Sequence, residues 1–408
     1  MTTMAIDNKD KKVLNVPHLR FPEFSGEWKK HSLGEIGETI IGLTYKPSDV
    51  VDNNGIIVFR SSNIKNGMID YSDLVRVNKH IKDKIITKEN DILVCARNGS
   101  QRLIGKNAII KQEDANNTFG AFMMVYRAND NPFILPLLST KKYFSQVGEN
   151  LGARINQITT SDFNGFEFYF PENHAERTKI AELFRLLDER IATQNKIIED
   201  LKKLKCAIID YTFDNKTQSH RKRILLSDVS AKITRRNTDN QNFNVLSNSA
   251  NQGIIPQNEV FDREIANENN TSNYFVISQN DFVYNPRKSV TAPYGPINSY
   301  NGETNGVISP LYLCFRCYGI DVEYLGWYFK SDSWHKYVYQ NGDTGVRHDR
   351  VSIKDEIFFS MPLYLHSTEE QMEIAKRLNK IESFVSQEEK YLFLLRSQKL
   401  YLLQQMFI

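Results

Sequence analysis

Two long stretches of the chain carry the hydrophobic spacing of coiled-coil helices. From residue 176 to residue 213, the pattern repeats at alternating steps of four and three, which places one set of positions along a single seam of a helix. The seam positions are Ile180, Phe184, Leu187, Ile191, Gln194, Ile198, Leu201, Lys205 and Ile208. Neither proline nor glycine interrupts this stretch. The pattern therefore predicts an unbroken helix of about 55–60 Å.

The second stretch matches the first slot by slot near the end of the chain. Its seam positions are Ile374, Leu378, Ile381, Val385, Glu388, Leu392, Leu395, Lys399 and Leu402. Because even the polar slots coincide, we expect the two helices to pair with each other as a coiled coil. If the pairing is antiparallel and symmetric, Gln194 lies opposite Glu388 in the middle layer, where a polar layer fixes the register. The alternative is that each helix packs only on its own domain.

The regions before the two helices follow a different period and resemble each other. Short β-type runs, such as residues 55–59 and 91–95, are separated by tight-turn signals such as Asn66-Gly67. Asn90-Asp91-Ile92 is echoed by Asn280-Asp281-Phe282, at an offset of about 190 residues. At similar offsets Arg97 is echoed by Arg287, Gly105 by Gly295, and residues 122–127 by residues 311–316. The chain thus reads as two copies of one unit, too long for a solenoid repeat.

These patterns together predict an α+β fold with an internal pseudo-twofold repeat. Two β-rich globular domains are separated by the two long helices. We expect a flexible N-terminal segment at residues 1–15, β-rich domains at 16–173 and 215–367, and helices at 174–214 and 368–408.

Composition narrows the possible classes of protein but does not indicate a function. The chain has 408 residues, of which 40% are hydrophobic and 25% charged, close to a folded globular average. No window approaches twenty consecutive apolar residues, and the polar N-terminus lacks the apolar core of a signal peptide, so we expect a cytoplasmic protein. The net charge of +3 excludes a polybasic tail but leaves room for local basic patches.

The four cysteines do not form a convincing metal or redox motif. Cys314 and Cys317 have CxxC spacing, but no second ligand pair follows at the distance of a zinc finger. They lie in residues 311–317, which are predicted as a strand, so we interpret them as packing residues.

Several ordered motifs resemble the specificity subunits of type I restriction-modification systems. They are residues 16–22 with Gly26-Glu27-Trp28, the helix starts at residues 176–181 and 370–375, and the closing residues 403–407. The end of the first helix, residues 209–213, departs from the family pattern, and none of these motifs is diagnostic alone. The resemblance covers nearly the whole chain.

The resemblance implies a role and a set of partners. Each β-rich domain is a target recognition domain that reads one half of a split, asymmetric site in double-stranded DNA. The two helices pair antiparallel as a coiled coil, hold the domains apart and set the spacing. The chain is not itself a catalyst and holds no cofactor. It binds two modification subunits, which carry S-adenosylmethionine and methylate adenine. Up to two restriction subunits, which use ATP and Mg²⁺, join the complex.

Polar and basic residues at strand ends are the candidates for DNA contact, because Arg, Lys, Asn, Gln and Ser on loops can reach the groove edges. In the first copy they are Arg60, Ser62, Asn63, Arg97, Asn98, Gln101, Arg102, Lys106, Arg154, Asn156 and Gln157. In the second copy they are Asn248, Gln252, Arg287, Lys288, Ser289, Arg347, His348 and Arg350. For any single residue, an ordinary solvated loop is an equally good interpretation. Tyr284 and Tyr294, close to these loops, are interpreted as packing residues.

An enzyme with its own active site finds little support in the sequence. The adenine methyltransferase tetrapeptide of the Asn-Pro-Pro-aromatic type is missing, since Asn285-Pro286 is followed by Arg287. There is no glycine-rich phosphate loop and no HxxxH metal pair. The alternative that remains is a two-domain scaffold that binds proteins through its helices and has no preference for DNA.

Overall fold

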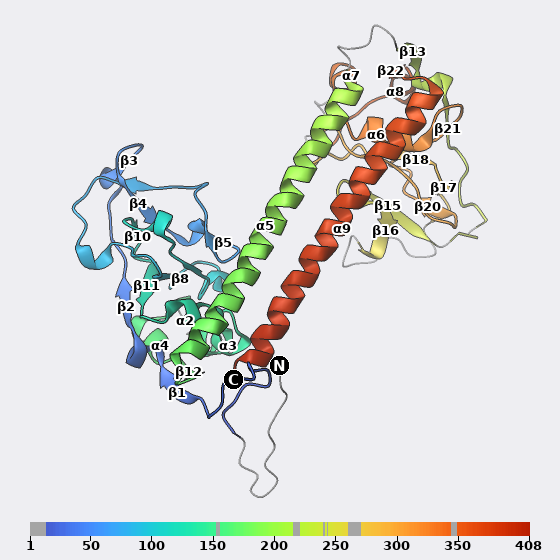
Figure 1. Cartoon of the computed structure of the whole chain (residues 1–408). Coiled ribbons are helices and arrows are strands. Elements are labelled where there is room, and N and C mark those ends of the chain that lie inside the picture. Colours follow the sequence, from blue (N-terminus) through green and yellow to red (C-terminus); the bar gives the residue numbers. More distant parts are fainter. Residues whose placement is uncertain are drawn as a thin grey trace, which may run out of the picture. The chain divides into compact units, whose positions relative to one another are not determined.

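The computed structural model describes residues 14–151, 156–214, 221–239, 241–242, 244–259, 271–343 and 349–408. The chain divides into two compact units. Unit 1 contains residues 1–195 and 390–408, and unit 2 contains residues 196–389. Two long helices, α5 (His174–Phe213) and α9 (Thr368–Met406), each contribute one part to unit 1 and the other part to unit 2 (Figure 1).

Unit 1 combines short strands with short helices. Its strands are β1 (Lys29–Ser32), β2 (Glu38–Ile41), β3 (Val50–Val51), β4 (Ile56–Phe59), β5 (Ile64–Lys65), β6 (Met68–Ile69), β7 (Arg76–Val77), β8 (Ile92–Cys95), β9 (Asn107–Ile109), β10 (Thr118–Phe119), β11 (Met123–Arg127) and β12 (Glu167–Phe170). Its short helices are α1 (Leu33–Ile36), α2 (Asn131–Leu137), α3 (Lys141–Asn150) and α4 (Thr160–Asn164). The predicted runs 55–59 and 91–95 correspond to β4 and β8.

Three sheets and a small hairpin of β5 and β6 organise unit 1. One has the order β2-β11-β8-β9 with antiparallel neighbours, and the second has the order β10-β4-β7-β3, in which β10 and β4 are parallel. A two-stranded ribbon joins β1 to β12. The core between the sheets and the helices is rich in aromatic rings, with Trp28, Phe133 and Phe407 in mutual edge or tilted contact.

Unit 2 repeats this plan. Its strands are β13 (Lys222–Leu225), β14 (Ser230–Lys232), β15 (Val245–Ser249), β16 (Gly253–Pro256), β17 (Phe275–Ile277), β18 (Phe282–Tyr284), β19 (Ile297–Ser299), β20 (Gly306–Ile308), β21 (Leu313–Cys317) and β22 (Pro362–Leu365). Its short helices are α6 (Val322–Phe329), α7 (His335–Asn341) and α8 (Asp355–Phe359). The order β14-β21-β18-β19 and the ribbon β13-β22 correspond to β2-β11-β8-β9 and β1-β12 of unit 1. The second sheet, β16-β15-β20-β17, also contains a parallel pair, β15 and β20, but β20 is an inner strand, whereas β10 of unit 1 is an edge strand.

The repeat extends to the backbone conformation of single residues. Asn90 and Asn280 both have a φ of 68°, and each precedes a buried aspartate. Gly105 and Gly295 also share the left-handed region, with φ of 79° and 84°. A Cβ at Gly295 would lie 2.0 Å from the carbonyl oxygen of Asn285, so only glycine fits there. The predicted duplication is therefore confirmed at the level of individual turns.

The predicted seam is the covered face of both helices. All eighteen seam positions are buried or half-buried. In unit 1, Ile180 and Phe184 of α5 share a core with Leu402 of α9, and Phe184 contacts the ring of Phe407 at 5.6 Å between centroids. In unit 2, Ile209 near the end of α5 shares a core with residues near the start of α9.

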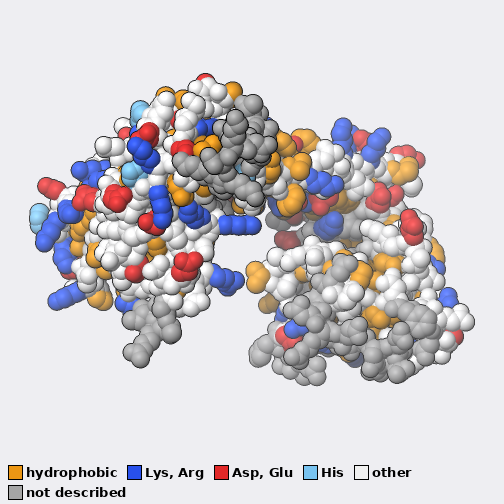
Figure 2. Space-filling view, turned by 90° about the horizontal axis from the view of Figure 1, so that it is seen from below, with side chains coloured by type: hydrophobic (Ala, Val, Ile, Leu, Met, Phe, Trp, Pro, Cys, Tyr) orange, Lys and Arg blue, Asp and Glu red, His pale blue; other side chains and the backbone are white. Residues whose placement is uncertain are grey.

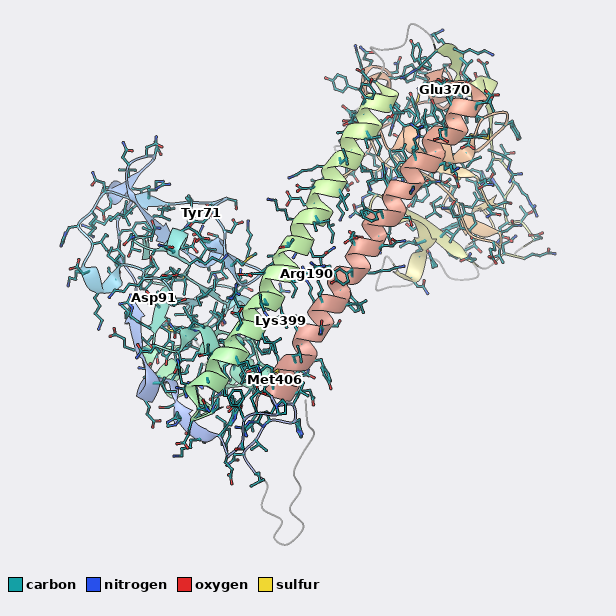
Figure 3. The ribbon with its side chains drawn as sticks, viewed as in Figure 1. Tyr71, Asp91, Arg190, Glu370, Lys399 and Met406 are labelled. Atoms are coloured by element: carbon teal, nitrogen blue, oxygen red, sulfur yellow. The ribbon has the colours of Figure 1, made fainter. Side chains whose placement is uncertain are left out.

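Polar contacts confirm that the helices run antiparallel within each unit. In unit 1, Asp188 of α5 pairs with Lys399 of α9, and Asn195 accepts a hydrogen bond from Arg396 at 3.0 Å. Figure 3 labels Arg190 and Lys399 in this stretch. Because residue numbers rise along α5 while they fall along α9, the pairing is antiparallel.

The contacts in unit 2 are the symmetry mates of those in unit 1. Lys205 of α5 pairs with Glu382 of α9, and Lys202 pairs with Glu389 at 2.6 Å. The seam lysines Lys205 and Lys399, which coincide in the two copies of the sequence, thus occupy equivalent places. The predicted pairing of Gln194 with Glu388 joins residues of the two units and stays a prediction.

Candidate nucleic-acid interface

A hollow in unit 1 brings together three segments that the sequence singles out. Its volume is about 890 Å³. Its lining includes Arg60, Ser62, Arg97, Asn98 and Asn156. These residues follow β4, follow β8, or precede α4, so they are far apart in the chain. The fold therefore places candidate side chains from separate loops around one concave surface.

Hydrogen bonds fix these loops to one another. The Asn98 side-chain amide donates to the Ser61 hydroxyl at 2.9 Å, and the Asn156 amide donates to the carbonyl of Gly99 at 3.0 Å. An antiparallel bridge joins Arg97 to Gln157. The loops thus form one connected rim, and such preorganisation lowers the entropic cost of binding a ligand.

The two arginines of the hollow differ in their surroundings. Arg60 forms an ion pair with Asp73 at 2.8 Å, and its Nη2 also donates to the Asp73 carbonyl. Arg97 is exposed and has no ion pair with any residue in the described ranges. Its guanidinium lies 5.0 Å from the centre of the Phe122 ring. Arg97 therefore keeps the donors that can bind a guanine edge or a phosphate.

Asn63 serves the scaffold of this rim. It is buried, its amide donates to the carbonyls of Asp70 and Asp73, and its carbonyl oxygen accepts from the backbone of Arg60. Its hydrogen-bonding capacity is used inside the protein, so it positions Arg60 and Asp73 and does not reach a ligand.

The other candidates of the first copy lie beside the hollow and are not part of its lining. Gln101 and Arg102 are exposed, while Lys106 and Gln157 are half-buried. Arg154 lies outside the described residues. Five of the candidate residues thus line the hollow. The others surround it, where they could contact the phosphate backbone of a nucleic acid.

The equivalent loops of unit 2 also lie together. An antiparallel bridge joins Arg287 to Arg350, as Arg97 is joined to Gln157 in unit 1. The backbone N–H of Lys288 donates to the carbonyl of Asp349 at 2.8 Å. Arg287 and Ser289 are exposed and Lys288 is half-buried. The two bridges are related by the internal repeat.

Asn248, like Asn63, belongs to the scaffold. It is 2% exposed, and its amide donates to the carbonyls of Val283 and Pro296 at 2.7 and 3.2 Å. Its oxygen accepts from the amide of Asn298 at 2.7 Å. Gln252 is exposed nearby. Arg347 and His348 lie outside the described residues.

The sequence interpretation missed the apolar part of these surfaces. Tyr45 and Phe122 line the hollow of unit 1, and Phe122 is 58% exposed. Leu311, the counterpart of Phe122, is 61% exposed in unit 2. The similarity between residues 122–127 and residues 311–316 could have drawn attention to these two positions. Apolar side chains are, however, usually expected in the protein core.

The aromatic and sulfur groups near the loops of unit 2 are packing groups. Tyr284 is buried and stacks on Phe358, and Tyr294 packs against His335. Burial raises the pKa of the Cys314 and Cys317 thiols to about 12, so both remain protonated at neutral pH. Among the described residues, no group of His, Cys, Asp and Glu could hold a metal ion.

Charge on the described surface is mixed. Lys and Arg side chains are interspersed with Asp and Glu on the face drawn in Figure 2. The formal net charge of the chain is only +3, so any nucleic-acid binding depends on local groups such as Arg97 and Arg287. Over the described residues, no helix is both long and apolar enough to cross a membrane.

Comparison with known structures defines the class of the fold. A crystal structure of the S subunit of a type I restriction-modification system from M. genitalium aligns with a TM-score of 0.57 at 16% identity, over 96% of this chain and 99% of that one. A structure from a study of complex assembly and conformational transition of the type I R-M system aligns with a TM-score of 0.54 at 15% identity, over 93% and 97%. The chain has the fold of these S subunits.

Comparison of sequences relates part of the chain to one family. Residues 25–203 match the model of the type I restriction modification DNA specificity domain. The EcoKI specificity subunit of Escherichia coli (strain K12) is 27% identical over 194 residues, 45% of this chain and 41% of its own length. The StySPI specificity subunit of Salmonella potsdam is also 27% identical over 194 residues, 45% of this chain and 42% of its own length. The chain thus matches less than half the length of these curated relatives, and the resemblance found in the sequence is confirmed.

Proposed function

We propose that this chain is the DNA sequence-specificity subunit of a type I restriction-modification complex. Each unit reads one half of a bipartite, asymmetric target with the loops that follow its central strands. The observation that carries the proposal is the repeated loop arrangement, in which the bridge between Arg97 and Gln157 recurs as the bridge between Arg287 and Arg350. Two related but non-identical readers suit a target with two different half-sites.

The sequence of the loops supports different half-sites. Arg97 is followed by Asn98 and Gly99, whereas Arg287 is followed by Lys288 and Ser289. An amide can pair with adenine in the major groove, while a lysine pairs with guanine or with phosphate. The arginine that both units share supports a common way of docking on DNA. The different residues that follow it support a different sequence preference for each unit.

In this proposal the catalytic steps are carried out by partner subunits. This chain holds no cofactor and does no catalysis of its own. Two modification subunits bring S-adenosylmethionine and methylate adenine, and up to two restriction subunits bring ATP and Mg²⁺. The internal pseudo-twofold repeat supports two modification subunits, because two similar surfaces recruit two similar partners. We place the complex in the cytoplasm, where its DNA substrate lies.

A methylation map tests the proposal. The chain is expressed with its modification partner in a host that lacks other adenine methylation, and methylated adenines are located across the genome. We expect a single split motif with two different halves and a fixed spacer. The modification partner alone and this chain alone are the controls, and neither should methylate DNA. Methyl transfer by the isolated chain would instead identify it as an enzyme.

Binding measurements separate this function from that of a protein scaffold. The purified complex should bind its target duplex with an affinity that falls steeply with salt, because phosphate contacts release counterions. A scaffold would bind its protein partners and show no preference for the target over a scrambled duplex.

A further inference from the structure

Phe122 and Leu311 occupy the third position of the same β-turn in the two units. In unit 1 the backbone N–H of Met123 donates to the carbonyl of Gly120 at 2.8 Å. In unit 2 the backbone N–H of Tyr312 donates to the carbonyl of Ser309 at 3.1 Å. Each turn connects a strand with a parallel neighbour, β10 or β20, to the central strand β11 or β21. The turn and its place in the topology are therefore part of the repeat.

Both turns present a large apolar side chain to solvent. Phe122 is 58% exposed and Leu311 is 61% exposed. Gly, Asn, Asp and Ser are the usual residues at such a turn position. Single exposed apolar residues are ordinary on protein surfaces, but the same turn position exposes one in both copies, although the residue type differs. Packing does not explain the repeated exposure, whereas contact with a ligand does.

The surroundings of Phe122 indicate what kind of ligand it meets. The backbone N–H groups of Ala96 and Arg97 both donate to the carbonyl of Phe122 at 3.0 Å, so the turn and the arginine loop move as one piece. The Arg97 guanidinium lies over the ring at 5.0 Å. Asn98 and Asn156 share the same hollow. An apolar group beside a guanidinium that has no counter-charge among the described residues matches the edge of a base pair that carries an apolar group.

The turn of unit 2 is held by different contacts. The Ser309 hydroxyl accepts a hydrogen bond from the backbone N–H of Leu311 at 3.3 Å. The Tyr312 hydroxyl lies 3.5 Å from that of Ser247 on β15, the strand that also carries the scaffold residue Asn248. The turn that carries Leu311 is thus tied to β15, whereas the backbone N–H of Arg287 donates to the side-chain oxygen of Asn285 at 3.0 Å.

We infer that Phe122 and Leu311 each contact the 5-methyl group of a thymine, one in each half of the target. This inference rests on the proposed function and adds the base that these positions read. The thymine methyl is the apolar group that the major groove of B-DNA displays, and apolar side chains distinguish it from the other base edges. Different apolar residues at one position suit thymines at different places in two unlike half-sites.

Replacing single thymines by deoxyuridine tests the inference, because this change removes the methyl group and keeps every hydrogen-bonding group. The full complex is titrated with duplexes that carry the target found by methylation mapping, with one thymine replaced at a time. We expect one position in each half-site at which deoxyuridine weakens binding about 3- to 10-fold.

Matched variants assign each position to its side chain. In Phe122→Ser the deoxyuridine penalty disappears in one half-site and persists in the other, and Leu311→Ser shows the reverse pattern. The persisting penalty reports that the variant is still folded. Phe144→Ser, on α3, and Tyr318→Ser, beyond the opposite end of β21, replace residues that are 47% and 56% exposed and should keep both penalties.

Two results would overturn the inference while leaving the proposed function intact. One is specific binding that is insensitive to deoxyuridine at every thymine, or a half-site without any thymine. The other is a pair of penalties that survive in both variants. Loss of specificity for any duplex, already in the unmodified complex, would refute the proposed function itself and this inference with it.

Discussion

The carboxylate of Asp91 accepts two hydrogen bonds from the guanidinium of Arg127, from Nε at 2.8 Å and from Nη2 at 2.7 Å. Asp281 and Arg316 repeat this fork in unit 2, at 2.6 and 2.8 Å. Both aspartates are buried and follow the left-handed asparagines of the repeat. The hydrogen bonds to Asp91 raise the pKa of Arg127 above its ordinary value. Those to Asp281 likewise raise the pKa of Arg316. Each fork ties the central strand to the loop before its neighbour.

The two forks should differ in their contribution to stability. The side chain of Arg127 is 20% exposed and that of Arg316 is 48% exposed. Asp91→Asn leaves a largely buried guanidinium without its counter-charge, which costs about 3–5 kcal/mol of unfolding free energy. Water can solvate Arg316 when Asp281→Asn removes its partner, so a smaller loss is expected there. Urea denaturation of both variants tests the order, and an equal or reversed loss would contradict it.

The helix seam should owe its stability to apolar packing more than to its ion pairs. Phe184→Ala removes a ring that is 1% exposed and should cost about 3–5 kcal/mol. The pair of Lys399 and Asp188 has side chains that are 22% and 42% exposed. A double-mutant cycle with Lys399→Ala and Asp188→Ala should therefore give a coupling of about 1 kcal/mol or less. A coupling as large as the loss from Phe184→Ala would reverse this ranking.

The long helices and the repeat were readable in the sequence because their signals extend over many residues. The heptad pattern predicted a helix at residues 176–213, and α5 spans His174–Phe213. The echo of Asn90-Asp91 by Asn280-Asp281 corresponds to two identical left-handed turns. Periodicity over many turns, and local geometry that demands asparagine or glycine, both leave marks in a single sequence.

The role of individual loop residues was not readable in the same way. Asn63 and Asn98 both follow a strand in a polar loop, yet Asn63 is fully buried and Asn98 lines the hollow. An asparagine that satisfies neighbouring carbonyls and one that faces a ligand look alike in sequence. Phe122 and Leu311 were missed for the opposite reason, since apolar residues beside a strand are normally assigned to the core.

Substitution of Arg97 and of Arg60 should distinguish a residue that contacts a base from one that supports the loop structure. Arg97→Ala removes an exposed guanidinium that has no counter-charge among the described residues and should weaken binding of the target by about 1–3 kcal/mol, through one half-site only. Arg287→Ala should do the same through the other half-site. Arg60 is already paired with Asp73. Arg60→Ala should therefore lower stability more than it changes the preference among half-site sequences.

Binding by a panel of duplexes with single base changes measures these preferences. If Arg97 contacts only phosphate, its removal should weaken all duplexes alike and reduce the salt slope by about one. Unchanged binding of the target by both Arg97→Ala and Arg287→Ala would show that these residues are only surface residues.

The paired helices should act as the ruler for the spacer. Inserting one heptad into both α5 and α9 preserves the seam and lengthens the helix pair by about 10 Å, close to three base pairs of B-DNA. The methylated motif of the variant should keep both half-sites and gain a longer spacer. An insertion of two residues, which turns the following part of the seam by about 200° away from its partner, is the control and should abolish methylation. An unchanged spacer after the heptad insertion would show that the helices do not set it.

Acidification should destabilise unit 2 through two half-buried histidines. Burial lowers the pKa of His366, whose Nδ1 lies 2.7 Å from the Tyr324 hydroxyl, and Arg221 lowers it further while Glu370 opposes the shift. Burial also lowers the pKa of His335, against the opposing effect of Asp332. The unfolded chain, with an ordinary histidine pKa of about 6.5, takes up these protons first as the pH falls. The stabilisation is therefore present above about pH 6.5 and is lost progressively below it.

Thermal unfolding between pH 7.5 and pH 5.5 tests this dependence. Hydrogen exchange in the strands of unit 2 reports on the unfolding of that unit. Its unfolding temperature should fall as the pH falls. His366→Gln retains a group that can bond to Tyr324 but cannot take up a proton, so the shift should become smaller. The same replacement at His80, which is exposed in unit 1, serves as the control. If acidification affects both units equally and His366→Gln leaves the shift unchanged, the half-buried histidines of unit 2 are not its cause.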